Sequence, residues 1–274
     1  MSKSNAPESK LIVYRGWLER GKHVWSPFVV KLEARLRFAG VSYIAEAGST
    51  QKSPNGKIPY VKFREVQPSD TISSSSNLED IPTFLGDSTL IIKHLVERDV
   101  LPNINAKVPP AANAQDLAIR ALLEDKLYFY HTWERWGENY YQMRDHILSA
   151  LSYPIRVVVG LLIYRKSMQT LHGQGTGRYT ASEIQSFRQE IWEGINALLL
   201  SAKFEADDAS TKPFWVLGGK GPTESDATLF GFIVSVLVCT ACPESQSLVK
   251  RFPVILEYAD RIHDTYFPDY LKWE

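Results

Sequence analysis

The stretch Trp25-Ser26-Pro27-Phe28 contains the first residues of the chain whose types and spacing could do chemistry. Ser26 is a favoured helix N-cap, and Pro27 suits the first helical position, where its missing N–H costs nothing. Apolar residues then recur at helical spacing as far as Gly40, so we predict a helix that begins at Pro27. A hydroxyl and free backbone N–H groups at a helix N-terminus suit an anion such as a thiolate, to which serine would donate a hydrogen bond. A lone Ser-Pro, however, is more often a helix cap and nothing else.

Two later motifs could complete a binding site. Lys57-Ile58-Pro59 places a proline at the start of a predicted strand over residues 58–63. If the bond before Pro59 is cis, the backbone of Ile58 can turn outward and pair with an extended peptide, and a trans proline at a strand start is the alternative. Asp87-Ser88 directly precedes an apolar helical run, so helix N–H groups and a hydroxyl could bind a carboxylate while Asp87 holds an ammonium. By itself this pair is also more often a cap.

The elements that must position these motifs change in character along the chain. Residues 1–10 suggest a disordered tail, and residues 11–100 mix strands (11–14, 41–44, 58–63 and an edge strand at 81–85) with helices. The serine-rich residues 67–80 suggest a long mobile loop, and residues 101–112, rich in Pro, Ala and Asn, suggest a linker. Residues 113–274 are almost entirely helical in period, with helices expected over 115–152, 155–170, 180–203, 225–240 and 254–266. We therefore predict an α+β chain, a small αβ domain followed by an all-helical domain.

Composition excludes several classes of function. Lys+Arg and Asp+Glu each total 31, so no net field favours nucleic acid or anionic lipid. The longest apolar run, 227–241, is shorter than the roughly 20 residues that a spanning helix needs. The first ten residues also lack a signal-peptide pattern. We therefore expect a cytoplasmic protein without a membrane anchor.

The cysteines and histidines show no pattern typical of a metal site. Cys239 and Cys242 have redox spacing, but they end an apolar helix, so buried core thiols are favoured in a reducing compartment. The six histidines lack metal-ligand spacing, and His23 is expected to be an exposed loop residue. We expect no metal.

Taken together, Ser26-Pro27-Phe28, Lys57-Ile58-Pro59 and Asp87-Ser88 resemble the glutathione transferase superfamily. The first motif is most similar to its tau-class serine enzymes, and the overall spacing is similar to the divergent branch of failed-axon-connections and metaxin proteins. Residues 223–226 before an apolar helix resemble the family's buried capping box, with Asp226 in the usual Glu/Gln place, and residues 251–258 resemble the start of its late C-terminal helix.

The resemblance implies a thioredoxin-like βαβ-ββα domain over residues 11–100, which binds glutathione, and an all-helical domain over 113–274. Ser26 matches the serine that hydrogen-bonds the glutathione sulfur. Ile58 matches the residue whose backbone pairs with the cysteinyl unit, and Pro59 matches the cis-proline.

The remaining matched residues concern the two ends of glutathione. Asp87 and Ser88 match the pair that grips the γ-glutamyl end, while Lys57 and, less directly, Lys52 would face the glycyl carboxylate. The long serine-rich loop before Asp87 departs from the family pattern.

The implied function is addition of the glutathione thiolate to an apolar electrophilic small molecule, in a chain that could form a homodimer. If the adduct collapses, the same site would isomerise a double bond, and a tailoring step on a specialised metabolite is as plausible as detoxification. A non-catalytic metaxin-like adaptor and a glutathione-binding or storage module are the alternatives. An aromatic cluster in the 115–152 helix is usually core but in this fold helps to wall the substrate cleft: Tyr128, His131, Trp133, Trp136, Tyr140 and Tyr141.

Overall fold

The computed structural model describes residues 11–17, 19–63, 83–206 and 212–273. Four short strands, β1 (Ile12–Tyr14), β2 (Ile44–Glu46), β3 (Tyr60–Phe63) and β4 (Thr83–Gly86), form one sheet in the order β2-β1-β3-β4. β1 pairs with β2 in parallel, and the pairs β1–β3 and β3–β4 are antiparallel. The mixed sheet and its helices confirm the predicted α+β class.

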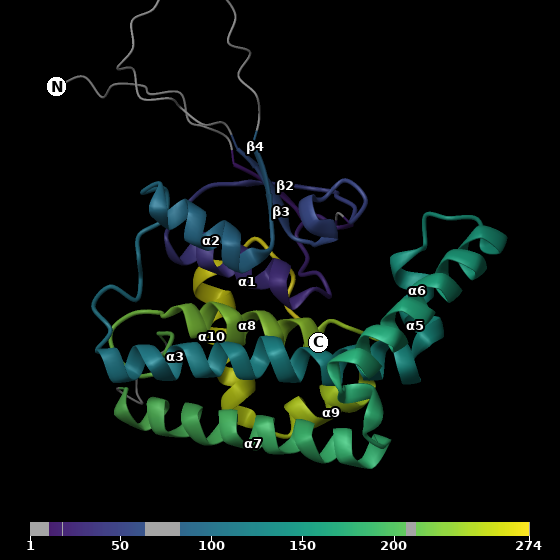
Figure 1. The fold of residues 1–274 in the computed structure, drawn as a ribbon. Coiled ribbons are helices and arrows are strands. Elements are labelled where there is room, and N and C mark those ends of the chain that lie inside the picture. Colours follow the sequence, from purple (N-terminus) through teal and green to yellow (C-terminus); the bar gives the residue numbers. More distant parts are fainter. Residues whose placement is uncertain (1–10, 18, 64–82, 207–211, 274) are drawn as a thin grey trace, which may run out of the picture.

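Helices α1 (Pro27–Phe38) and α2 (Ser88–Glu97) cover one face of this sheet. Val13 and Val61 are register partners on β1 and β3, and both pack into one apolar cluster with Leu32 and Leu36 of α1 and Ile91 of α2. Figure 1 shows the sheet above these two helices, with the helical part of the chain below them.

The sheet differs from the predicted strands in detail. The strand expected over 41–44 is wrong, because the N–H of Val41 bonds to the carbonyl of Leu36 and so closes the end of α1, and β2 starts only at Ile44. Tyr43 is held instead by its hydroxyl, which donates to Glu33. The predicted edge position of the last strand is confirmed by β4. The tail over 1–10 and the loop over 67–80 lie outside the described residues.

The rest of the described chain is helical. After α3 (Pro110–Leu122) come a π-helical turn (Leu123–Leu127), α4 (Tyr128–Trp133), a second π-helical turn (Glu134–Glu138) and α5 (Tyr140–Ile147). Then follow α6 (Tyr153–Gln174), α7 (Ala181–Glu205), α8 (Glu224–Leu237), α9 (Pro243–Lys250) and α10 (Pro253–Tyr266). The single helix predicted for 115–152 is thus broken by two π-turns. α3 starts inside the predicted linker, and α9 was not predicted.

Helix α8 is the centre of the molecule, and every residue from Ser225 to Leu237 is buried. Its start is fixed by Asp226, which accepts hydrogen bonds from the N–H groups of Thr223 and Val216 and from the hydroxyl of Tyr258, each at 2.8 Å. The predicted buried capping box is therefore confirmed. Gly231 lets α8 touch the first turn of α1, because a Cβ there would lie 2.5 Å from the carbonyl oxygen of Pro27.

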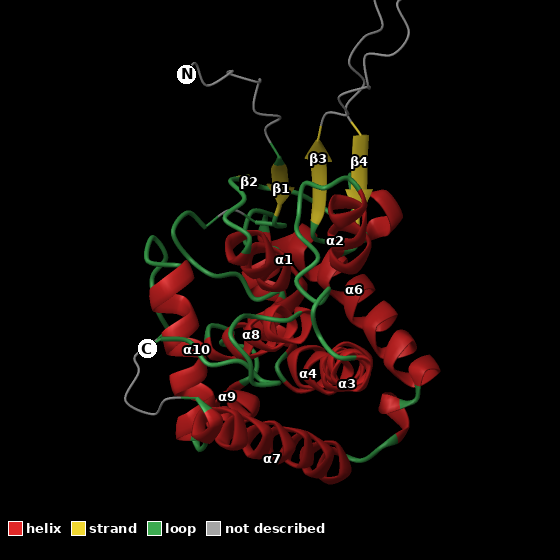
Figure 2. Cartoon of the chain, turned by 90° about the vertical axis from the view of Figure 1, so that its left-hand side faces the viewer, coloured by secondary structure: helices red, strands yellow, loops and turns green. Residues whose placement is uncertain are grey.

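Because α1 lies between the sheet and α8, three of its charged residues, Lys31, Glu33 and Arg35, are buried as well. The Nζ of Lys31 lies 2.6 Å from Glu124 and 2.9 Å from the hydroxyl of Thr89. The guanidinium of Arg35 lies 2.6 Å from Glu224. Figures 1 and 2 show the resulting layers, with the sheet uppermost, then α1 and α2, then α8 and α3, and α7 at the far side. Within the described ranges, no helix is both long enough and apolar enough to cross a bilayer.

Candidate functional site

Ser26 is the N-cap of α1, as its sequence predicted. Its Oγ accepts a hydrogen bond of 3.4 Å from the N–H of Val29, and its carbonyl accepts from the N–H of Val30. The side chain is only partly buried. A hydroxyl that accepts one bond still has its own proton to donate, so this position offers a donor beside the positive end of a helix.

The residue before it anchors this helix start in the core. The Trp25 ring is buried and stacks on His146, with ring centroids 3.5 Å apart. The carbonyl of Trp25 accepts a hydrogen bond of 3.0 Å from Arg135, which also donates to the carbonyl of Ser235 on α8. Sequence reasoning missed both Arg135 and His146, since neither belongs to a local motif.

The two cysteines complete the surroundings of Trp25. Cys239 and Cys242 are free and fully buried, and both pack against Trp25, so the prediction of core thiols is confirmed. Burial would raise the pKa of Cys239, but a hydrogen bond with Cys242 and the charge of Arg135 lower that pKa to about 7. Because both thiols are buried, they offer no accessible nucleophile.

The second predicted motif lies where the loop after β1 meets β3. The Ile58–Pro59 peptide bond is cis, which confirms the expected geometry, and the N–H of Asp87 bonds to the carbonyl of Pro59. A Cβ on Gly16 would lie 3.4 Å from the side chain of Ile58. This arrangement brings the start of β3 next to the end of β4, where the third motif begins.

Asp87 lies at this junction and has the uncommon φ of 78°. One carboxylate oxygen caps α2 by accepting from the N–H groups of Thr89 (3.0 Å) and Leu90 (3.4 Å), and the other lies 2.7 Å from the Nζ of Lys57. Partial burial would raise the pKa of Asp87, but the bond and charge of Lys57 and the two N–H groups outweigh it and hold the pKa below its ordinary value.

The loop that carries Lys57 is fixed by a close backbone contact. A Cβ on Gly86 would lie 2.6 Å from the carbonyl oxygen of Pro54, so only glycine lets this loop approach the end of β4. Ser88, the first residue of α2, is buried beside Asp87. Lys52 lies exposed earlier in the loop and is not among the residues that the structure joins to Asp87.

His23, expected to be exposed, is buried among aromatic rings and the second histidine His263. The loop before α1 is packed under the C-terminal segment, and this packing covers the ring. Among the described residues, no group of three or more His, Cys, Asp or Glu side chains is placed to hold a metal ion.

Of the aromatic cluster, Tyr128 is the member that reaches the first motif. Its ring lies 5.0 Å from that of Phe28, centroid to centroid. His131 and Trp136 are buried in the helical core, and Tyr140 packs on Tyr164 of α6. Tyr128 and Phe28 therefore lie together beside the start of α1.

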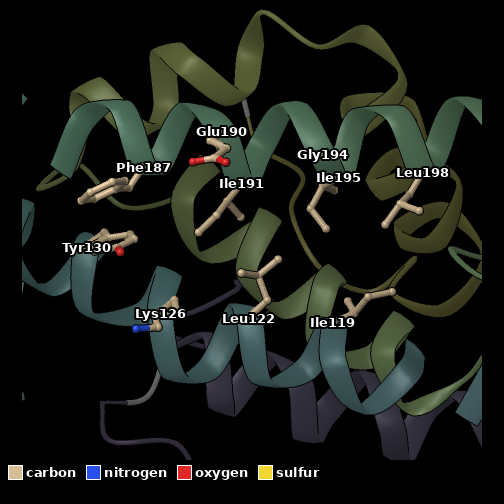
Figure 3. Close-up of a pocket in the computed structure, with 10 residues that line it drawn as sticks. All are labelled: Ile119, Leu122, Lys126, Tyr130, Phe187, Glu190, Ile191, Gly194, Ile195 and Leu198. Atoms are coloured by element: carbon tan, nitrogen blue, oxygen red, sulfur yellow. The ribbon is translucent and has the colours of Figure 1, made fainter. Parts of the chain in front are cut away.

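A separate apolar groove of about 540 Å³ lies between α3 and α7. Figure 3 shows Ile119 and Leu122 of α3 facing Ile191, Ile195 and Leu198 of α7 across it. None of the predicted site residues lines this groove, which lies on the side of α3 away from the sheet (Figures 1 and 2).

Comparison with known proteins agrees with this architecture. Residues 27–143 match the family model described as glutathione S-transferase N-terminal domain. Glutathione transferase GSTFuA3 from Phanerochaete chrysosporium is similar with a TM-score of 0.55 and 14% identity, over 97% of this chain and 98% of that chain. FzlA from C. crescentus is similar with a TM-score of 0.53 and 10% identity, over 95% and 91%.

A third similar structure is a glutathione transferase family member from Pseudomonas fluorescens with two glutathione bound. Its TM-score is 0.50 at 14% identity, over 95% of this chain and 91% of that chain. At such identities the likeness establishes the fold, a thioredoxin-like N-terminal domain with a helical C-terminal region. The domain match and the fold are therefore similarities of this chain to glutathione transferases.

Proposed function

We propose that the protein is a serine-type glutathione transferase that adds the glutathione thiolate to an apolar electrophile. The observation that carries this proposal is the position of Ser26, a hydroxyl at the N-cap of α1, at the helix start where the thioredoxin-like domain meets the helical region. The match of residues 27–143 and the fold support glutathione as the cosubstrate.

In this proposal Ser26 only donates a hydrogen bond to the glutathione sulfur. A free thiol has a pKa of about 8.5, so little of it is ionised at neutral pH. A hydroxyl donor and the positive end of α1 both stabilise the thiolate and lower this pKa. The thiolate then forms a bond to an electrophilic carbon, and the displaced electron pair leaves with a leaving group or enters a conjugated system that solvent protonates. If the adduct expels the thiolate again after bond rotation, the outcome is isomerisation.

Glutathione would bind along the edge formed by the second and third motifs. The backbone of Ile58 would pair with the cysteinyl unit, and Asp87 with Ser88 would hold the γ-glutamyl end. Lys57 and Lys52 would face the glycyl carboxylate. Because Lys57 is bonded to Asp87, binding would exchange one ion pair for two, with the ligand ammonium on Asp87 and its carboxylate near Lys57.

One observation favours a second function, that of a non-catalytic adaptor. The Ser26 hydroxyl and the Asp87 carboxylate both act as helix caps, which is the role expected if neither binds a ligand. Under this alternative the chain would resemble the failed-axon-connections and metaxin proteins in function.

The two functions are separated by binding and turnover measured on the same preparation. Calorimetric titration with glutathione tests the site, and mass spectrometry of products from a panel of apolar electrophiles tests catalysis. Binding with a glutathione adduct or isomer supports the transferase, whereas binding without any product supports a glutathione-binding module without catalysis. No binding of glutathione would contradict the transferase and favour the adaptor.

A further inference from the structure

The first half of α6 exposes apolar side chains to an unusual degree. Of its 22 residues, only Gly160 and Leu171 are buried. Val158 and Leu162 are each 61% exposed. The exposed apolar side chains on the side of the helix opposite Gly160, named here the α6 face, are Ile155, Val158, Leu161 and Leu162. Contiguous exposed apolar surface of this kind marks an interaction site.

The geometry of α6 explains why this face points outward. A Cβ on Gly160 would lie 2.6 Å from Cγ of Arg144, so α6 crosses α5 at Gly160. Residues on the other side of the helix therefore face away from α5. Figure 1 shows α5 and α6 extending sideways from the rest of the molecule.

Charge along α6 itself is positive. Residues 146–182 contain Arg165, Lys166 and Arg178 and no Asp or Glu, while the fourth cation of this range, Arg156, lies 3.7 Å from Asp145 of α5. Arg165 follows Val158 by seven residues and Leu162 by three, and Lys166 follows Leu162 by four. Helical spacing thus places two exposed cations on the same side as the apolar residues, one turn further along.

We propose that the α6 face docks the protein on the surface of a membrane that contains anionic lipids. The apolar residues would enter the interface between headgroups and acyl chains, while Arg165 and Lys166 meet the anionic headgroups. The proposal does not depend on the proposed function, and it departs from the sequence-based expectation of no membrane contact.

A second copy of the chain is the other candidate occupant, and charge disfavours it. If the α6 faces of two copies met with their helices parallel, Arg165 and Lys166 of each copy would lie beside those of the other. An anionic surface instead complements both features of the face.

Vesicle co-sedimentation of the full chain tests the proposal. The probes are vesicles of phosphatidylcholine alone and vesicles with about 30% phosphatidylserine. We expect binding to the anionic vesicles that weakens as salt rises. Leu162→Asp should lower the fraction bound by about tenfold, and Arg165→Glu with Lys166→Glu should do the same. The matched control is Leu200→Asp, which changes an exposed leucine of α7 and should leave binding unchanged.

A second measurement reports insertion directly. Because both native thiols are buried, Val158→Cys places one reactive thiol on the α6 face for an environment-sensitive fluorophore. We expect a blue shift of its emission with anionic vesicles. Absence of binding to anionic vesicles, or binding that Leu162→Asp leaves unchanged, would overturn the proposal. A dimer in lipid-free solution that Leu162→Asp converts to monomer, without vesicle binding, would assign the face to self-association instead.

Discussion

Lys57 and Asp87, predicted to bind opposite ends of glutathione, are bonded to each other at 2.7 Å between Nζ and Oδ2. Lys57 is mostly exposed, so solvent screens this pair and we expect it to add less than about 1 kcal/mol to stability. In the proposed site the pair would matter more for binding, because a ligand that carries both an ammonium and a carboxylate would separate the two residues. Asp87 also caps α2, and its two roles can be separated by substitution.

The first prediction separates the charge of Asp87 from its cap. Asp87→Asn keeps a side-chain oxygen for the N–H groups of Thr89 and Leu90, so stability should fall by only a few tenths of a kcal/mol. Loss of the charge should weaken glutathione binding by about 1.5–3 kcal/mol. Asp87→Ala should lose both, with about 1 kcal/mol of stability in addition. Calorimetric titration and urea unfolding measure these effects, and unchanged affinity in Asp87→Asn would remove Asp87 from the site.

The second prediction concerns the pH dependence of stability. Burial, together with the charges of His263, Arg15 and Arg37, lowers the pKa of His23 to about 3, while the nearby Asp269 opposes this. In the unfolded chain its pKa is about 6.5. Between these values the unfolded state binds one more proton at this residue, so stability falls as pH falls, by about 1.4 kcal/mol per pH unit.

His23→Leu should therefore make the unfolding free energy less dependent on pH, by the amount that one bound proton contributes to the slope. Urea unfolding at pH 5, 6 and 7 measures the slope in both proteins. The other buried histidines, His131 among them, remain in the variant and provide the residual slope. An equal slope in wild type and variant would show that His23 does not stay neutral when folded.

The third prediction tests the ion pairs that join α1 to the helical region. Lys31 is buried and Glu124 is partly buried, so removing one partner leaves a poorly solvated charge. Lys31→Met should cost about 2–3 kcal/mol, and adding Glu124→Met should recover part of this loss. A double-mutant cycle in urea measures the coupling. The exposed pair Lys22 and Glu19 is the control, and its coupling should stay under about 1 kcal/mol. Equal coupling in the two pairs would contradict the prediction.

The fourth prediction concerns the thiols of Cys239 and Cys242. Both are free and buried, so Ellman's reagent should label neither in the native protein and both after unfolding. Reductant should change neither the chain mass nor the melting temperature. Rapid labelling of one thiol in the native state would mean that the segment after α8 opens on that timescale.

Local sequence signals predicted the structure best at the starts of helices, which depend on residues within a single helical turn. Ser26 and Pro27 specify the start of α1, and Thr223 with Asp226 specifies the start of α8, because caps act within three residues. The residues that hold these turns in space were not predictable in this way. Arg135 binds the carbonyl of Trp25 across 110 residues, and nothing near either residue indicates that contact.

The errors have a similar origin. Tyr43 has high strand propensity, yet its hydroxyl donates a hydrogen bond to Glu33, and the strand begins one residue later. The apolar character of α6 predicted its helix but not its exposure, since apolar residues are usually buried. The pairing of Lys57 with Asp87 depends on the contact of Gly86 with Pro54, which only the folded backbone defines.

The fifth prediction returns to Ser26 and decides between the transferase and the adaptor. Ser26→Ala removes the hydroxyl but leaves the positive end of α1, so the pKa of bound glutathione thiol should rise by about one to two units without reaching its value in solution. Loss of the cap should cost about 1 kcal/mol of stability, and the variant should still fold. Glutathione affinity should change little, because its two ends bind elsewhere.

Ser26→Thr is the matched control, because it keeps a hydroxyl that both caps α1 and donates. Thiolate absorbance of bound glutathione against pH, with turnover of any accepted electrophile, measures all three proteins. If Ser26 stabilises the thiolate, Ser26→Thr should retain most of the lowered pKa and of the rate while Ser26→Ala loses both. If the three titrations and rates coincide, the hydroxyl bonded to Val29 is only a helix cap, and the adaptor becomes the better description of the protein.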